Sequence, residues 1–368
     1  MRIHGLMAGL VLLSGSALAG DLGLPEVPIP VDNPQTPEKV ALGDRLFHDT
    51  RFSTTGEVSC STCHDAPTGW TDSPKVVSEG IGGKTGTRNS PTVLNAAFNK
   101  SQFWDGRSPS LEDQSQHPFI NPVEMGLADH EPILAVVRDD AEYGEQFNKA
   151  FGVATEGITM DHVQKAIAAF ERTVVSGNSP FDRWFFGGEA DALNAQEQEG
   201  YRLFITKGRC VSCHVIEQTS ATFTDHRFHN IGVGINRIQD DIAPLAHAFM
   251  KADATVEEVD VAVLTDPRSS ELGRFAVTRD LDEMGNFKTP TLRNVSLTAP
   301  YMHDGSIETL PKVIEHYNNG GVTSEGDPVN DFLSGGIRPL DLSDEEQAAL
   351  VAFLEALTSP VIPTSSTK

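Results

Sequence analysis

The four cysteines of this 368-residue chain form two pairs, and a histidine follows each pair directly. The two motifs read Cys60-x-x-Cys63-His64 and Cys210-x-x-Cys213-His214. This spacing is typical of haem c attachment, because the two thiols add across the haem vinyl groups and the adjoining imidazole then lies under the iron as its proximal ligand. A zinc site built from all four cysteines is the alternative, but it leaves both histidines unexplained. The motifs therefore predict two covalently bound haem c groups.

The N-terminal residues have the pattern of a cleaved secretory signal. Met1–Ala19 combines a basic start, an apolar stretch from Leu6 to Leu13 and a small-residue end at Ala17–Ala19. Export fits the motifs, because haem c is attached outside the cytoplasm. No later stretch approaches the roughly 18 apolar residues of a membrane span. We therefore expect a periplasmic protein with no membrane span.

Composition excludes some classes of partner. The chain carries 52 acidic and 28 basic side chains, for a net charge of −24. Such a surface repels nucleic acid and anionic lipid, although it also suits a basic partner protein or simply keeps the chain soluble. The length suggests two domains. We place an N-terminal haem domain at residues 20–180 and a C-terminal haem domain at residues 181–368.

Apolar residues recur at helical spacing in five segments, which predict a mainly α fold. These segments are Thr36–His48, Asp161–Val174, Asn194–Ile205, Ser306–Asn318 and Ser343–Leu357. Ser343 and Glu346 form a capping box at the start of the last one. Residues 65–92 and 215–288 are rich in Gly, Pro and Asp, and we expect them to form long loops around the haems.

The chain also repeats itself weakly, at an offset of 199 residues. The matched segments are Pro91-Thr92-x-x-Asn95 with Pro290-Thr291-x-x-Asn294, Trp104-Asp105-Gly106 with His303-Asp304-Gly305, and Leu111 with Leu310. The haem motifs themselves are offset by only 150 residues. The second half therefore carries 49 extra residues between its haem motif and its Pro-Thr segment.

The repeat predicts different surroundings for the two irons. A helix should follow each Asp-Gly turn, and in the second half Tyr317 lies on the apolar face of that helix. The equivalent position in the first half is Pro118, which cannot bind iron. We infer that His214 and Tyr317 close the second iron, whereas the first iron is open beside Gln114, Pro118 and Glu124.

Alternatives remain open for these residues. Tyr317 would also serve as a core aromatic residue with a hydrogen-bonded hydroxyl group. Gln114 and Glu124 would also suit a solvated loop. The rival ligands of the second iron are Met284, Met302, His303 and His316.

Several motifs together resemble the bacterial di-haem cytochrome c peroxidases and their MauG relatives. Besides the haem motifs, they are Phe103-Trp104-Asp105-Gly106-Arg107, Gln114, Asn121-Pro122-Val123-Glu124-Met125, Pro290-Thr291-Leu292-Arg293-Asn294 and Ala299-Pro300-Tyr301-Met302-His303. The resemblance runs from about Pro37 to Leu357. It implies two cytochrome c-like domains with long loops and a calcium ion between them.

The resemblance also implies roles for single residues. Asn89, Thr298 and Pro300 would supply the calcium oxygens, the latter two through their backbone carbonyls. Trp104 would relay electrons between the haems, although simple core packing is the alternative. Glu124 would be the acid and base beside the peroxide, with Gln114 as its polar neighbour.

Two departures from the peroxidase pattern matter. Peroxidases of this family that rest inactive hold a distal histidine on the first haem, but no histidine occurs here between His64 and His117. The same peroxidases bind the second iron through a methionine, and the matching position here is Tyr317, as in MauG. A phenolate stabilises oxidised iron, whereas a thioether favours reduced iron.

These observations favour a peroxidase that reduces hydrogen peroxide to water with electrons from a c-type cytochrome or cupredoxin. The alternative is a MauG-like enzyme that takes the electrons from side chains of a partner protein. A third hypothesis is a di-haem electron carrier without catalysis. Pro118 and the missing distal histidine argue against the carrier.

Overall fold

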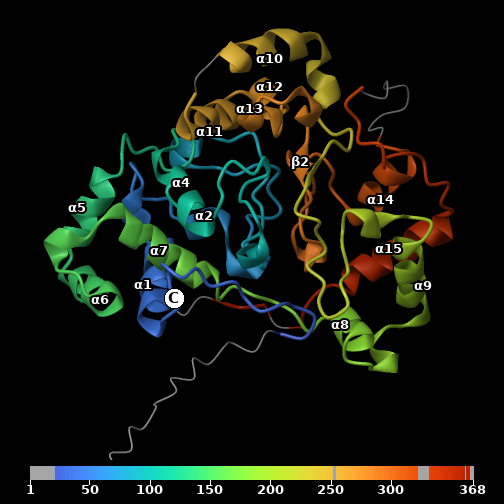
Figure 1. Cartoon of the computed structure of the whole chain (residues 1–368), viewed down its shortest axis with the longest axis horizontal. Coiled ribbons are helices and arrows are strands. Elements are labelled where there is room, and N and C mark those ends of the chain that lie inside the picture. The colour runs from blue at the N-terminus through green and yellow to red at the C-terminus, as the bar shows by residue number, and fades with distance from the viewer. Residues whose placement is uncertain (1–20, 252–253, 322–330, 361, 365–368) are drawn as a thin grey trace, which may run out of the picture.

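The computed structural model describes residues 21–251, 254–321, 331–360 and 362–364. The predicted signal segment Met1–Ala19 lies outside these residues. The mainly α prediction is confirmed (Figure 1). The helices are α1 (Pro37–His48), α2 (Cys60–Cys63), α3 (Leu111–Gln114), α4 (His117–Ile120), α5 (Glu131–Asp139), α6 (Ala141–Phe151), α7 (Met160–Glu171), α8 (Pro180–Phe185), α9 (Ala195–Ile205), α10 (Ile242–Lys251), α11 (Val256–Thr265), α12 (Pro267–Ser270), α13 (Phe275–Thr278), α14 (Leu310–Asn318) and α15 (Asp344–Glu355). Strands β1 (Phe228–His229) and β2 (Phe287–Lys288) pair antiparallel.

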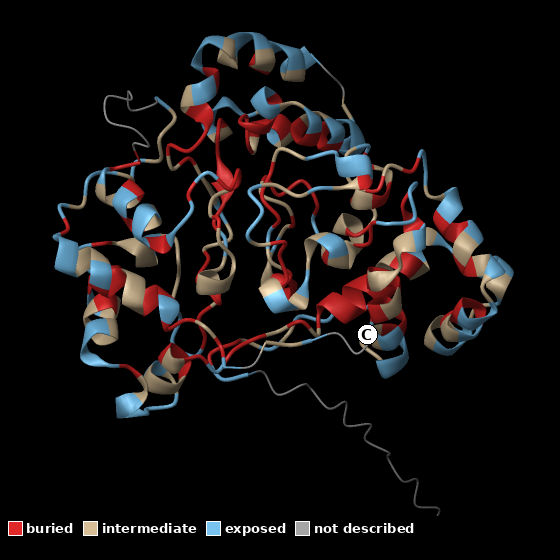
Figure 2. Ribbon diagram, turned by 180° about the vertical axis from the view of Figure 1, so that it is seen from behind, coloured by how far each residue is buried: buried red, intermediate tan, exposed pale blue. Residues whose placement is uncertain are grey.

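Each half of the chain is built on one pair of packed helices, α1 with α7 and α9 with α15. A glycine allows the close approach in each pair. A Cβ atom on Gly43 would lie 1.9 Å from the Ala166 carbonyl oxygen, and one on Gly200 would lie 2.0 Å from that of Ala349. The buried residues of these helices face each other in both halves (Figure 2). The two halves therefore share one helix-packing plan.

Helix ends follow the capping residues in the sequence. The predicted helices at Thr36, Asn194 and Ser343 begin directly after those residues, whose side chains accept hydrogen bonds from backbone N–H groups of the first turn. The predicted helix over Ser306–Asn318 begins only at Leu310, because Thr309 is its cap. The helix predicted over Asp161–Val174 ends at Glu171.

The internal repeat is present in the backbone. Asn95 and Asn294, 199 residues apart, both adopt positive φ angles, of 63° and 60°. Short antiparallel bridges join Gln102 to Ser108 in the first half and Tyr301 to Ile307 in the second, at the same offset. A helix follows each Asp-Gly turn, but in the first half it is divided into α3 and α4. The repeat therefore provides equivalent positions in the two halves.

The expectation of a long loop is correct for residues 65–92 and wrong for residues 215–288. The second segment contains α10 to α13, which form a helical cap at the top of the molecule (Figure 1). This cap has its own apolar core, which includes Val263, Phe275 and Met284. The signal for α11 was in the sequence, since Thr255 and Glu258 form a capping box before an apolar run.

The ends of the chain tie the halves together. The backbone carbonyl of Gly23 accepts hydrogen bonds from Ala221 and from Arg293 of the second half. In the opposite direction, Trp70 of the first half donates its indole N–H to the carbonyl of Pro363 at 2.9 Å. Segments near both ends of the described chain therefore connect the two halves.

Candidate functional site

The first motif forms the short helix α2, and His64 ends it. A capping box of Ser59 and Thr62 starts the helix. The Nδ1 atom of His64 lies 3.3 Å from the Trp70 carbonyl oxygen and 3.2 Å from Ser90 Oγ. A hydrogen bond from Nδ1 to a carbonyl fixes the ring and leaves Nε2 as the metal-binding atom.

The second motif repeats this arrangement. Cys210–Ser212 forms a single 3-10 turn, and His214 Nδ1 lies 2.8 Å from the Phe223 carbonyl oxygen. Trp70 and Phe223, which present the two carbonyls, both have positive φ angles. Sequence reasoning identified the two histidines but not these carbonyl partners, because no residue type marks a backbone acceptor.

The residues at both motifs fit a covalently attached haem. All four cysteines are free thiols, so neither pair forms a disulfide. Burial raises the pKa of Cys63 and Cys210 to about 12 and lowers the pKa of both motif histidines. A neutral imidazole is the form that iron ligation needs. A cavity of about 640 Å³ adjoins the second motif.

Three of the predicted catalytic residues lie in one cavity with the first motif. Gln114 ends α3, Pro118 lies in α4, and Glu124 follows the turn after α4. All three line the cavity that also contains Cys60, Cys63 and His64. Met125 lines it too, with its side chain packed in the first core. Among the described residues that line this cavity, His64 is the only histidine.

The buried Oε2 atom of Glu124 has no hydrogen-bond partner in the described part of the chain. Burial, and then the negative charge of Asp260, raise the pKa of Glu124 to about 8, while the charge of Arg107 opposes the shift. A carboxyl group with a pKa near the working pH can both accept and donate a proton. Glu124 therefore has the electrostatic environment of an acid and base.

Asp260 of the helical cap contacts Arg107, which lines the first cavity. Asp260 lies on α11 and accepts hydrogen bonds from Arg107 Nε at 2.8 Å and from Asn121 Nδ2 at 2.5 Å. Leu264 of the same helix lines the cavity. The extra residues of the second half therefore cover the haem site of the first half. Sequence reasoning missed this role because it assigned the segment to a loop.

Trp104 lies between the two cavities and lines both of them. Its indole N–H donates to the Asn89 carbonyl oxygen at 2.8 Å, and its own carbonyl accepts from the Lys288 N–H at 2.7 Å. Backbone from both halves thus fixes the ring. This position suits a relay between the haems.

Tyr317 lies on α14 and lines the second cavity with Cys210 and His214. Burial, and then the two thiols of the motif, raise the pKa of its phenol. Among the rival ligands, Met302 and His303 also line this cavity. Met284 packs in the core of the cap, and His316 Nε2 lies 2.8 Å from the Ile231 carbonyl oxygen.

Comparisons with known proteins agree with this geometry. The family model described as di-haem cytochrome c peroxidase matches residues 37–191. The chain is 36% identical to the cytochrome-c peroxidase IdrP1 of Denitromonas iodatirespirans, over 97% of this chain and 93% of that protein. It belongs to the di-haem cytochrome c peroxidase family. It is thus an oxidoreductase, and its two motifs are consistent with the two haem c groups of that family.

Relatives within this family carry two kinds of name. The chain is also 38% identical to the methylamine utilization protein MauG of Methylorubrum extorquens, over 95% of this chain and 88% of that protein. The crystal structure of a MauG-like protein associated with microbial copper homeostasis superposes with a TM-score of 0.73 at 33% identity, covering 92% of this chain and 94% of that one. Family membership alone therefore leaves open which electron source this di-haem peroxidase uses.

The residues expected at a calcium ion line the second cavity. They are Asn89, Thr298 and Pro300. Asn89 donates its side-chain N–H to the Val76 carbonyl at 3.1 Å, and Ser73 donates to the Ala299 carbonyl at 2.5 Å. The donor set of one amide and two carbonyl oxygens fits calcium, which prefers oxygen ligands.

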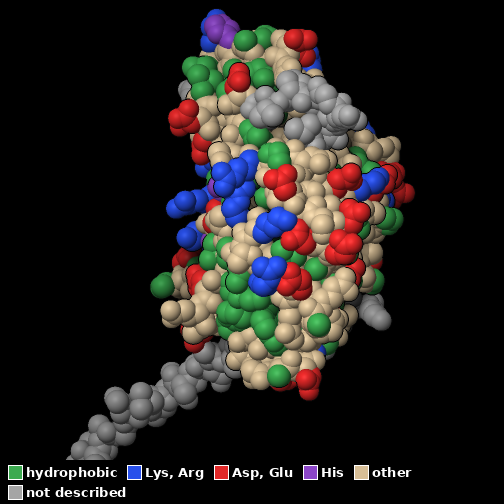
Figure 3. Space-filling model, turned by 90° about the vertical axis from the view of Figure 1, so that its right-hand side faces the viewer, with side chains coloured by type: hydrophobic (Ala, Val, Ile, Leu, Met, Phe, Trp, Pro, Cys, Tyr) green, Lys and Arg blue, Asp and Glu red, His purple; other side chains and the backbone are tan. Residues whose placement is uncertain are grey.

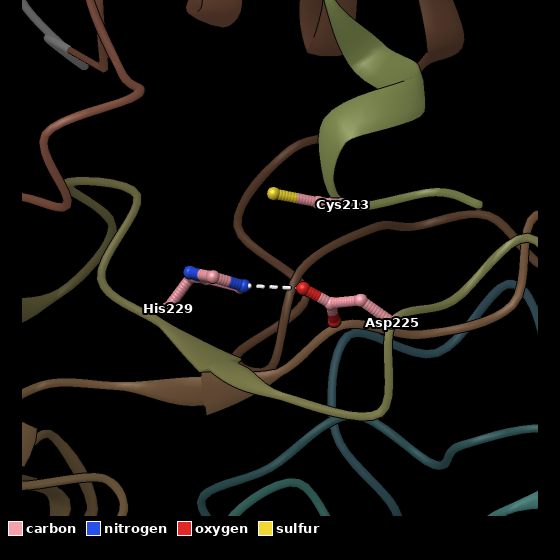
Figure 4. A group of neighbouring side chains, drawn as sticks. All are labelled: Cys213, Asp225 and His229. Carbon is pink, nitrogen blue, oxygen red and sulfur yellow. Dashed lines mark hydrogen bonds and ion pairs between the residues drawn. The ribbon is translucent and has the colours of Figure 1, made fainter.

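A cluster of three polar side chains adjoins the haem motif of the second half. Cys213, Asp225 and His229 lie close together, and Asp225 accepts a hydrogen bond from His229 Nε2 at 2.8 Å (Figure 4). In a di-haem peroxidase, Cys213 is needed for haem attachment. We therefore interpret the Asp225–His229 pair as part of the haem pocket, and its spacing in the sequence gave no sign of it.

The helices give no indication of a membrane anchor. In the described parts of the chain, none is both long enough and apolar enough to cross a bilayer.

Proposed function

We propose that this protein is an exported, periplasmic peroxidase that reduces hydrogen peroxide to water with electrons from a c-type cytochrome or a cupredoxin. The observation that carries the proposal is Glu124, a half-buried residue in the same cavity as the Cys60-x-x-Cys63-His64 motif, whose buried Oε2 atom has no hydrogen-bond partner among the described residues. A buried carboxylate oxygen without a hydrogen bond is energetically unfavourable unless a ligand or a proton binds to it. Peroxide bound in this cavity would satisfy it.

The protein side of the reaction is a proton transfer. When held at this motif by Cys60, Cys63 and His64, a haem would supply the redox chemistry that reduces peroxide. Glu124 would accept the proton of one peroxide oxygen and donate it to the other oxygen, which leaves as water. Gln114 orients the peroxide from the end of α3. Pro118 stands at the position of the first half that is equivalent to Tyr317 in the second half. Proline offers no ligand atom, so the peroxide site stays open.

Electrons would reach this site through Trp104, whose ring lines both cavities. The donor protein would dock beside the second haem. On that side of the molecule, Lys and Arg side chains lie among Asp and Glu side chains, and a group of hydrophobic side chains lies beside them (Figure 3). Charged side chains on such a surface steer the encounter with a redox protein.

A MauG-like function is the second candidate, and Tyr317 is the observation that favours it. A phenolate ligand from α14 would stabilise the oxidised second haem and make it a poorer acceptor of electrons from a donor protein. The electrons would then come from side chains of a partner protein. A pure electron carrier is the least supported hypothesis, because it needs a second strong ligand on the first iron.

We further propose one structural calcium ion held by Asn89, Thr298 and Pro300. The backbone oxygen of Asn89 also accepts a hydrogen bond from the indole N–H of Trp104. An ion at Asn89 would therefore stiffen the segment that holds the relay. Calcium removal by a chelator should slow electron transfer between the haems.

Spectroscopy of the purified ferric protein tests the catalytic proposal. One high-spin and one low-spin haem are expected, and two low-spin haems would contradict an open first iron. Peroxide turnover with reduced cytochrome c then separates the two candidates. Rapid turnover supports the peroxidase, whereas slow turnover together with a long-lived oxidised state supports the MauG-like enzyme.

The variants Tyr317→Met and Tyr317→Phe define the role of the phenol. Methionine restores the ligand type of the related peroxidases, and phenylalanine removes only the oxygen. If both variants keep the wild-type spectrum and donor oxidation rate, Tyr317 is not a ligand.

A further inference from the structure

A second buried carboxyl group lies at the first haem cavity, and the peroxide reaction does not use it. Glu171 is the last residue of α7, and its side chain lines the cavity with Cys60 and His64. The residue is 5% exposed, and its Oε2 atom is buried without a hydrogen-bond partner among the described residues. A buried oxygen without a hydrogen bond is energetically unfavourable. Its presence at this position needs an explanation.

The internal repeat supplies a matched position without the carboxyl group. Gly43 on α1 packs against Ala166 and Phe170 of α7, and Gly200 on α9 packs in the same way against Ala349 and Phe353 of α15. The residue after Phe170 is Glu171, and the residue after Phe353 is Leu354. Leu354 is also 5% exposed and lines the cavity of the second haem. The same place therefore holds a carboxyl group at the first haem and an isobutyl group at the second.

Among the residues that the structure describes, the charged groups around Glu171 leave it without an ion-pair partner. Arg172, the next residue, pairs instead with Glu112 of α3 at 2.8 Å. On α1, which packs against α7, His48 and Asp44 pair with each other at 3.2 Å. Burial raises the pKa of Glu171 to about 8, a shift that Arg172 opposes and Glu112 increases. The neighbouring titratable group on α2 is the thiol of Cys60. Haem attachment uses up this thiol. Glu124 and Arg107 line the same cavity.

We propose that Glu171 couples the oxidation state of the first haem to the binding of one proton. The oxidised haem carries one more positive charge than the reduced haem, so it favours the Glu171 carboxylate. Reduction by one electron from the donor protein removes that charge, and Glu171 then takes one proton from solvent and becomes neutral. One electron and one proton enter the cavity together, so its net charge does not change. Leu354 cannot take up a proton, so the second haem lacks this coupling.

This inference rests on the proposed function only in that a haem occupies the first cavity. The test is a potentiometric titration of the full-length two-haem protein over a range of pH, without peroxide. Wild-type protein should show a first-haem potential that falls as pH rises. Between the pKa values of Glu171 in the two oxidation states, the ratio of reduced to oxidised first haem should fall about tenfold per pH unit at a fixed potential. Glu171→Gln and Glu171→Leu should abolish this part of the pH dependence.

The second haem of the same molecule is the internal control, because its pH dependence should be equal in wild type and in both variants. Leu354→Glu is the reciprocal variant. It should make the potential of the second haem depend on pH. Haem content and the ferric spectrum confirm that each variant is assembled. If Glu171→Gln retains the wild-type pH dependence at the first haem, the proposal is wrong. That outcome is independent of peroxide turnover, so it leaves the proposed function untouched.

Discussion

The two haem sites of this protein are built on the same parts and differ at a few equivalent positions. In each site a motif histidine lies within hydrogen-bond distance of the carbonyl of a residue with positive φ. The differences concern the other side of the site. Pro118 corresponds to Tyr317, and Glu171 corresponds to Leu354. A shared scaffold can thus hold two haems alike while side chains at matched positions assign them different chemistry.

The helical cap adds a second difference. It belongs to the second half in the sequence, yet Asp260 and Leu264 of α11 act on the first cavity. The first-half residues that line the second cavity, such as Asn89 and Trp104, come from loops, and none of them lies in a helix of the described residues. The extra segment of the second half therefore completes the haem site of the first half.

Transferring the tyrosine to the first site is the strongest way to break the comparison. In Pro118→Tyr, a phenol enters the first cavity at the position equivalent to Tyr317. The first haem should change from high-spin to low-spin, and peroxide turnover should fall to the background rate. Pro118→Phe is the matched control, since it has the same ring without the oxygen. It should remain high-spin, and a low-spin spectrum for Pro118→Phe would show that ligation by the new phenol is not the cause.

Removal of the acid and base should have the next largest effect. Glu124→Gln keeps the shape of the side chain but cannot exchange a proton. The rate of peroxide cleavage should fall about 100- to 10,000-fold, with both haems still attached. Stopped-flow absorbance after mixing with peroxide measures this rate. Glu131→Gln, at an exposed carboxyl group on α5, should have no effect. An active Glu124→Gln variant would remove the main support for the proposed mechanism.

The Asp-Gly turns of the two halves should differ in stability. Asp105 is fully buried between Arg88 and Arg107, whose charges overcome the effect of burial and lower its pKa to about 2. The equivalent Asp304 pairs with Arg237, whose side chain is 54% exposed. Arg107→Leu removes one of the two arginines at Asp105 and the ion-pair partner of the buried Asp260, and it should destabilise the protein by about 3–5 kcal/mol.

Arg237→Leu breaks a partly solvated pair and should cost only about 0–1 kcal/mol. Chemical denaturation of the two variants measures the difference. Equal losses of stability would show that exposure does not distinguish the two turns.

The smallest predicted effect concerns pH. Glu124 must begin as a carboxylate to accept the peroxide proton, so peroxide cleavage should speed up as pH rises through its pKa, near 8. Asp260→Asn removes a negative charge that raises this pKa and leaves the opposing charge of Arg107. The rising limb of the pH–rate profile should therefore move to lower pH. A limb that stays in place would show that the helical cap does not tune Glu124.

Much of the site could be predicted from the sequence because covalent chemistry fixes spacing. Two thiols must meet two vinyl groups, so the Cys-x-x-Cys-His motifs identify the haem positions without a structure. Helices with strong caps, such as those that begin after Thr36, Asn194 and Ser343, were also predictable, since capping is a local interaction. The repeat also predicted that Tyr317 and Pro118 stand at equivalent positions, because the offset of 199 residues can be counted in the sequence.

Other features depend on which segments pack together, and the tertiary structure alone decided them. The pKa of Glu124 depends on Asp260, more than 130 residues away in the chain. The importance of Glu171 emerged only when the packing of α7 on α1 matched the packing of α15 on α9. Burial and charge act through space, and a side chain's distance from its neighbours along the chain does not fix its distance from them in the folded protein.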